Sequence, residues 1–214
     1  MNYTWRFLLV LLSVASVCLA GGQVLVMATA GDVDSDLAEQ VRSYLQDQCG
    51  AVVRTTAPVA VESGQSLDDI GRAAAQALGQ GEFGVIVLAR AEPDQPQGVC
   101  LPHERFGIIN ISRLEEGADR TTLIRRAGQD SLRVSALLLD MSTCPFPLCV
   151  LTGFERTEDL DRMSGNYCPP CQDRFTRLAR TANLQLLEPK PKAEAAEDAE
   201  VPAEPEAHSP GDPE

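Results

Sequence analysis

Histidine is scarce in this chain of 214 residues, which contains only His103 and His208. A catalytic zinc site held by three imidazole side chains therefore cannot be assembled from one copy of the chain. Basic residues are also few, since 18 lysines and arginines stand against 31 acids and leave a formal net charge of -13. Without a basic stripe to replace the counterions of a phosphate backbone, the chain is not expected to bind nucleic acid.

Other catalytic signatures are missing as well. His103 lies in the loop from Leu101 to Arg105, with no recognisable nucleophile motif beside it. The segment from Gly79 to Gly81 lacks the pattern of a phosphate-binding loop. Adjacent acids such as Asp68 and Asp69 are typical of solvated faces or helix caps. The sequence thus indicates how the protein is built more clearly than what it does.

The two ends of the chain differ from its middle in composition. Arg6 precedes an apolar stretch that runs to Ala20 and is followed by two glycines, which is the pattern of a signal peptide over residues 1–20. That stretch is short for a membrane span of about 20 residues, so we expect no integral span after cleavage and an exported protein, periplasmic or extracellular. Residues 188–214 carry nine acids and two lysines and are expected to form a disordered acidic tail.

Residues 21–187 are the right size for one domain with one core. Apolar runs alternate there with helical periods, which favours an α/β fold with a mixed sheet. The runs predict strands at 23–28, 51–61, 83–89 and 105–111. The helical periods predict helices at 35–48, 67–78, 120–141 and 172–181, with Asp34 or Ser35 capping the first and Ser66 preceding the second.

Four cysteines follow the long helix in two closely spaced pairs. Cys144 and Cys149 form C-x4-C, and Cys168 and Cys171 form C-P-P-C. Two such turns, stiffened by prolines, are typical of a closed structural zinc site with four thiolate ligands. The alternatives are two local disulfides, or a redox-active pair at Cys168 and Cys171, since a helix that begins after Cys171 lowers the pKa of a thiol near its start.

Cys49 and Cys100 remain as a further pair in the mature chain. An exported domain commonly joins such cysteines in a disulfide, and closing a loop of that size stabilises a fold by roughly 4 kcal/mol. We therefore predict a disulfide between them, with two buried free thiols as the alternative.

The long helix followed by C-x4-C and C-x-x-C resembles the archaemetzincins, a family of metzincin zinc peptidases. The family motif is H-E-x-x-H-x-x-G-x-x-H-C-x4-C-x-M followed by C-x-x-C. The match is most specific from Arg105 to Phe175 and includes the apolar strands at 83–89 and 106–111. The resemblance implies a metzincin-like mixed sheet, an active-site-type helix and a structural zinc at Cys144, Cys149, Cys168 and Cys171.

The catalytic positions of that motif are occupied by other residues here. Counting back from Cys144, the three histidine positions fall on Arg133, Leu137 and Thr143, and the glutamate position falls on Val134. The glycine position falls on Asp140 and the methionine position on Leu151.

None of these side chains replaces the imidazoles or the carboxylate that activate a zinc-bound water. We therefore expect a pseudo-peptidase with a binding or scaffolding role, whose cleft takes a peptide or protein and in which Arg133 is a candidate anchor for a carboxylate. The alternatives are a thiol-disulfide protein that uses Cys168 and Cys171, and a zinc-dependent peptidase with unrecognised chemistry.

Overall fold

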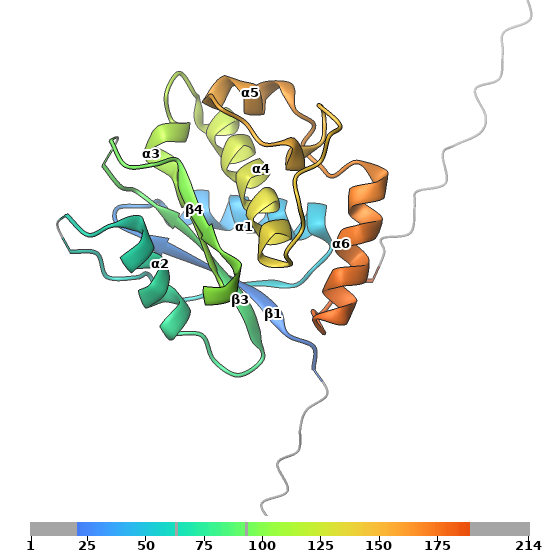
Figure 1. Ribbon diagram of the computed structural model, residues 1–214. Helices are drawn as coiled ribbons and strands as arrows, with labels where there is room; N and C mark the ends of the chain where they lie inside the picture. The colour runs from blue at the N-terminus through green and yellow to red at the C-terminus, as the bar shows by residue number, and fades with distance from the viewer. Residues whose placement is uncertain (1–20, 63, 93, 189–214) are drawn as a thin grey trace, which may run out of the picture.

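The computed structural model describes residues 21–188, apart from residues 63 and 93, and shows a sheet with helices on both faces (Figure 1). The predicted signal peptide and nearly all of the predicted acidic tail lie outside the described residues. The sheet has five strands in the order β2-β1-β3-β5-β4. The strands are β1 (Val24–Ala30), β2 (Val53–Thr55), β3 (Glu82–Ala89), β4 (Gly98–Leu101) and β5 (Phe106–Asn110).

The sheet is mixed, as predicted. β1, β2, β3 and β5 are parallel, and β4 pairs antiparallel with β5 at one edge. β1 and β3 are almost entirely buried along their length, as expected for parallel strands covered on both faces.

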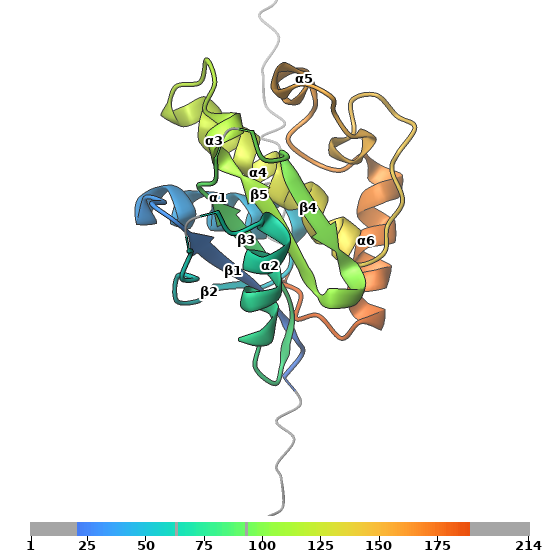
Figure 2. The same ribbon diagram turned by 60° about the vertical axis from the view of Figure 1, so that its left-hand side comes forward.

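One face of the sheet carries most of the helical mass. α1 (Ser35–Cys49) and α4 (Arg120–Leu138) pack against each other there and share the larger core cluster with α6 (Pro169–Thr181). α2 (Leu67–Gln76) covers the other face, as Figure 2 shows, and packs in the smaller cluster. Two short helices, α3 (Ile111–Leu114) and α5 (Thr157–Arg162), lie near the start of α4.

Side-chain caps fix where the main helices begin. The Asp34 carboxylate accepts hydrogen bonds from the backbone N–H groups of Asp36 and Leu37, and the Ser66 hydroxyl accepts one from Asp69. Asp119 caps α4 in the same way. These caps satisfy N–H groups that have no partner within the helix, as the sequence predicts for α1 and α2.

Close contacts between elements depend on two glycines. A Cβ atom at Gly128 in α4 would lie 2.4 Å from the ring of Tyr44 in α1. A Cβ atom at Gly71 in α2 would lie 2.2 Å from the ring of Phe106 in β5. The absence of a side chain at these positions therefore sets how closely α4 approaches α1 and how closely α2 approaches the sheet.

The structure differs from the predicted elements in three places. The segment predicted as one strand at 51–61 contains only β2 and isolated bridges at Ala51 and Val59, and Pro58 has no N–H group to extend a ladder. β4 lies in a segment for which no strand was predicted. α6 begins at Pro169, because proline is well suited to the first turn of a helix. No helix among the described residues is long and apolar enough to cross a membrane.

Candidate metal centre and the cleft along helix α4

The four cysteines of the two turns come together in space. The Sγ atoms of Cys144, Cys149, Cys168 and Cys171 all lie within 4.8 Å of one another, and those of Cys144 and Cys168 are 3.8 Å apart. Four sulfurs placed about 2.3 Å from a central zinc form a tetrahedron with edges of about 3.8 Å. The donor set and its spacing therefore fit one tetrahedral metal ion, as the sequence predicts.

Backbone N–H groups support the negative charge of these sulfurs. Phe146 donates to the Sγ of Cys144 and Cys168 donates to the Sγ of Cys149, each at 3.4 Å. Burial, and after it the neighbouring thiols, nevertheless raises the pKa of Cys171. Burial is also the main cause of the raised pKa of Cys149. Four crowded thiols resist joint ionisation, and a bound cation removes that conflict.

The cysteine cluster is anchored to α4 by the residue before Cys168. Tyr167 is buried, donates a hydrogen bond from its hydroxyl to the carbonyl oxygen of Leu132 at 2.6 Å and lies 3.1 Å from the hydroxyl of Ser135. Its ring stacks on Phe175 of α6 with centroids 5.3 Å apart. The metal centre is thus tied to the middle of α4 and to the start of α6.

The residues at the motif's catalytic positions line a cleft along α4. Arg133, Val134 and Leu137 border a groove of about 300 Å³, whose opposite wall includes Gly98 to Cys100 of β4. Arg133 also borders an adjoining hollow of about 640 Å³ together with Thr143. Phe154 and Glu155 line both spaces. The structure therefore places Arg133, Val134, Leu137 and Thr143 around two adjoining spaces, together called the cleft, with Arg133 bordering both.

The turn after α4 contains a residue with left-handed backbone geometry at the motif's glycine position. Asp140 occupies that position with a φ of 58°, in the left-handed region that favours glycine and is tolerated by aspartate. Leu151, at the motif's methionine position, is buried in the turn from Val150 to Thr152 and accepts a hydrogen bond from the N–H of Cys144. Asp140 and Leu151 thus both lie in turns that follow α4.

The cleft also contains a buried carboxyl group, that of Asp130, which was not predicted from the sequence. Asp130 is 3% exposed, and burial raises its pKa from 3.8 to about 6 although Arg133 and the Gln97 side chain lower it. Cys100 faces the same space, and burial raises the pKa of its thiol to about 11. A thiol with so high a pKa is a poor nucleophile at neutral pH. Polar residues at core-facing positions of a predicted helix are the signal that would have singled out Asp130.

Other buried polar side chains of α4 hold the far wall of the cleft. Arg126, 4% exposed, donates to both carboxylate oxygens of Asp161 at 2.9 and 2.6 Å. This pairing lowers the pKa of Asp161 to about 2. Gln129 donates to the carbonyl oxygen of Leu160 at 3.1 Å. These bonds fix α5 against α4, and sequence periodicity gave no sign of them.

The predicted disulfide between Cys49 and Cys100 is wrong. Both are free cysteines, and they lie in different elements of the fold. Cys49 ends α1 just before β2, whereas Cys100 lies in β4, and these strands form opposite edges. Four strand spacings of about 4.8 Å separate the two edges by roughly 19 Å, beyond the reach of a disulfide. The alternative of two free thiols holds, with Cys49 buried and Cys100 half-buried.

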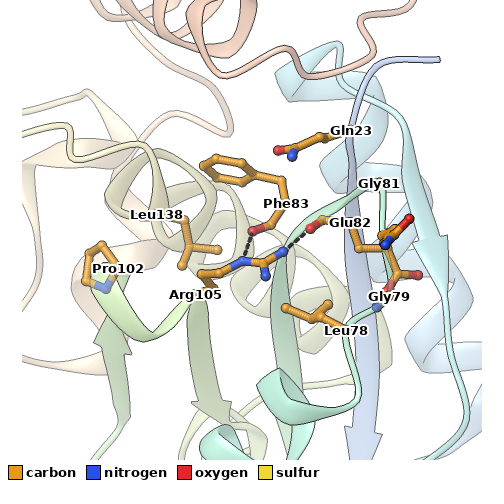
Figure 3. Close-up of a pocket in the computed structure, with 10 residues that line it drawn as sticks. Gln23, Leu78, Gly79, Gly81, Glu82, Phe83, Pro102, Arg105 and Leu138 are labelled. Carbon is orange, nitrogen blue, oxygen red and sulfur yellow. Dashed lines mark hydrogen bonds between the residues drawn. The ribbon is translucent and has the colours of Figure 1, made fainter. Parts of the chain in front are cut away.

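Another pocket, of about 590 Å³, lies at the amino ends of the parallel strands (Figure 3). Arg105 lines this pocket and has a φ of 65°. Its side chain donates hydrogen bonds to the carbonyl oxygens of Phe83 and Glu82. Its guanidinium group is therefore committed to the start of β3. Ligands of α/β sheets usually bind at the opposite, carboxyl ends of the strands. His103, whose side chain is 76% exposed, contacts only Glu104 among the ion pairs of the described residues.

Comparisons with known proteins place this architecture in a class. No family model and no curated protein matches the chain. Solved structures do match, among them a zinc-dependent peptidase and two archaemetzincins. A zinc-dependent peptidase from Methanocorpusculum labreanum has a TM-score of 0.58 and 19% identity, covering 71% of this chain and 99% of that one.

Two archaemetzincins match in the same way. That of Methanopyrus kandleri has a TM-score of 0.62 and 16% identity, covering 75% of this chain and 97% of that one. That of Archaeoglobus fulgidus, complexed with malonate, has a TM-score of 0.53 and 14% identity, covering 71% and 99%. The chain therefore has the archaemetzincin fold, which confirms the predicted fold class.

Proposed function

We propose that this protein is an exported, non-catalytic domain of archaemetzincin fold that binds an extended peptide segment along β4. The observation that carries this proposal is the unpaired edge of β4 beside the groove over α4. The arrangement supports recognition of a peptide main chain, and the residues at the motif's catalytic positions supply no metal-binding or proton-transfer chemistry.

The register of β4 shows which backbone groups are available. The N–H of Asn110 donates to the carbonyl oxygen of Gln97, and the alternation of an antiparallel ladder then directs the backbone groups of Val99 and Leu101 toward β5. The N–H and C=O groups of Gly98 and Cys100 consequently point to the free edge. An added strand would pair with these groups, as in other domains that bind peptides by β-augmentation.

A structural zinc is the second part of the proposal. Cys144, Cys149, Cys168 and Cys171 would hold it. The similar structure from Methanocorpusculum labreanum is described as a zinc-dependent peptidase, which is consistent with zinc as the metal. A zinc ion with four thiolate ligands has no open position, so it supplies folding energy and no catalysis.

Hydrolysis is not expected in the cleft. Arg133 is cationic, Val134 and Leu137 are apolar, and Thr143 is a weak ligand, so the positions that would bind a catalytic zinc offer no imidazole. Peptidase assays of the mature domain should show no activity that responds to added zinc or to a chelator.

Substitution of Cys100 by proline tests the binding edge. Proline removes the outward N–H while leaving the ladder bonds of Val99 and Leu101 to β5, and Cys100→Ala is the matched control because it removes only the thiol. Binding would be measured with a library of extended peptides whose ends are blocked and which contain no acidic residues. We expect wild type and Cys100→Ala to bind and Cys100→Pro to lose affinity. If a folded Cys100→Pro variant binds as wild type does, or wild type binds no peptide, the proposal fails.

A thiol-disulfide role at Cys168 and Cys171 is the second candidate. Burial opposes ionisation of Cys168, but the N–H of Cys171 and the neighbouring thiols lower its pKa, and the residue directly precedes α6. Thiol titration of protein purified without chelator separates the two functions. One tightly held zinc per chain supports the structural site, whereas a reducible disulfide and no metal supports the redox function.

A further inference from the structure

Arg133 is a largely buried cation without a hydrogen-bond partner. Its side chain is 27% exposed, yet its donors make no hydrogen bond within the described part of the chain, and its Nε atom is buried and unpaired. Its nearest carboxylate oxygen, on Asp130, lies 3.8 Å from Nη1, which is beyond hydrogen-bond distance. Buried donors are normally satisfied, so this side chain requires an explanation.

The other arginines of similar burial are all satisfied. Arg126 lies two turns earlier on the same helix and donates to Asp161 and to the carbonyl oxygens of Leu114 and Glu116. Arg42, Arg90 and Arg125 each donate to a carboxylate as well. The fold therefore provides carboxylates that accept hydrogen bonds from its other half-buried arginines, whereas the carboxylate nearest to Arg133 is too distant to accept one.

Packing holds the guanidinium group of Arg133 in place at the border of the two spaces in the cleft. Its central carbon lies 5.7 Å from the centroid of the Phe154 ring, in a cation-π contact. Its Nη2 atom lies close to Gly153, where a Cβ atom would be 3.7 Å away. The group is thus oriented by an aromatic face and a small residue while it opens into the hollow of about 640 Å³. An oriented planar fork of donors matches a carboxylate in shape and charge.

We infer that Arg133 binds a carboxylate group of the ligand in this hollow. The inference rests on the proposed function, because the hollow adjoins the groove beneath β4, and it specifies the class of peptide: one that presents a C-terminal carboxylate or an acidic side chain.

The other charged groups of the hollow do not already fill this role. Asp159 accepts hydrogen bonds from the backbone N–H groups of Arg156 and Glu155 and pairs with the Arg156 side chain. Glu155 and Arg162 are exposed at the rim. Asp130 lies on the groove side of Arg133, so a carboxylate that enters from the hollow meets the guanidinium group first.

The test follows the Nε–H signal of Arg133 by nuclear magnetic resonance in the full mature protein. N-acetyl-trialanine with a free C-terminal carboxylate is titrated against the same peptide with a C-terminal amide. We expect the acid to move the Arg133 signal saturably and to bind at least about tenfold more tightly than the amide, as charge-assisted hydrogen bonds do. The Arg126 signal, whose donors are occupied, should not move.

Variants and a second peptide pair complete the experiment. Arg133→Gln should abolish the preference for the acid and Arg133→Lys should weaken it. Arg54→Gln removes an exposed arginine of β2, at the opposite edge of the sheet, and should leave the preference unchanged. A blocked peptide with an internal glutamate, compared with its glutamine counterpart, distinguishes an acidic side chain from a chain terminus as the source. Equal binding of acid and amide, or no response at the solubility limit of the acid, overturns the inference. The neutral blocked library with Cys100→Pro tests the proposed function separately, so either conclusion can fail without the other.

Discussion

Replacing Asp130 by asparagine should stabilise the protein at neutral pH. The pKa of Asp130 rises from 3.8 to about 6 in the folded protein, mainly because the carboxyl group is buried. Since one pKa unit corresponds to ~1.4 kcal/mol, ionising this group costs about 3 kcal/mol more in the folded protein than in the unfolded chain. The attraction of Arg133 is already contained in that pKa, so it does not cancel the cost.

The sign of the pH dependence follows from proton binding. Between pH 3.8 and about 6 the folded protein holds the Asp130 proton more tightly than the unfolded chain does, so stability falls as pH rises through this window. Above it the full cost applies. Asparagine resembles the protonated acid and remains neutral, and it still offers an acceptor to Gln97. We therefore expect Asp130→Asn to raise the free energy of unfolding at pH 7 by about 1–3 kcal/mol.

Urea unfolding of both proteins at several pH values between about 5 and 8 measures this effect. The quantity of interest is the difference between the two proteins, because any loss of metal at low pH affects both. Asp173→Asn, on the exposed surface of α6, controls for the loss of one negative charge. A difference that stays constant across this range, or an Asp130→Asn variant less stable than wild type at pH 7, would refute the reasoning.

Three further predictions concern the metal centre and the segments that are held against α4. Elemental analysis should find one zinc per chain, and Cys168→Ser should lose the metal and the folded structure of the last third, as seen by proteolysis, because metal binding is coupled to folding. Asp161→Asn leaves Arg126 buried without its counter-charge and should cost about 3 kcal/mol in urea unfolding at pH 7. Because the pKa of Asp161 is lowered to about 2, its stabilisation in wild type is present above pH 3.8 and is lost on acidification toward about 2, and the variant should lack this dependence. Tyr167→Phe removes the hydrogen bond to Leu132 and should cost about 1 kcal/mol, and an unchanged melting temperature would contradict that bond.

The sequence predicted the elements whose signals are local. The caps at Asp34 and Ser66 and the apolar periods of α1 and α2 sufficed for these helices, and the spacing of the cysteines sufficed for the metal cluster. β4 was missed because it has only four residues, begins with glycine and follows a proline-rich turn. Its strand character comes from pairing with β5, which no local pattern reveals.

The interior of the cleft was less predictable. Arg126, Gln129 and Asp130 are buried because segments distant in sequence cover α4, and Arg126 finds its carboxylate 35 residues along the chain. The wrong disulfide between Cys49 and Cys100 has the same origin. Counting cysteines identifies those left over, but only the order of the strands shows that they lie far apart.

The short length of β4 limits how long any ligand paired with it can stay. Only two of its residues direct backbone groups outward, which allows at most about four main-chain hydrogen bonds. At roughly 1 kcal/mol each they give about 4 kcal/mol, equivalent to a dissociation constant of about 1 mM. With association rates of about 10⁵ to 10⁷ M⁻¹s⁻¹, such a complex lasts on the order of 0.1 to 10 milliseconds. A peptide held on this edge by main-chain contacts alone therefore dissociates quickly, and a longer-lived complex requires side-chain contacts as well.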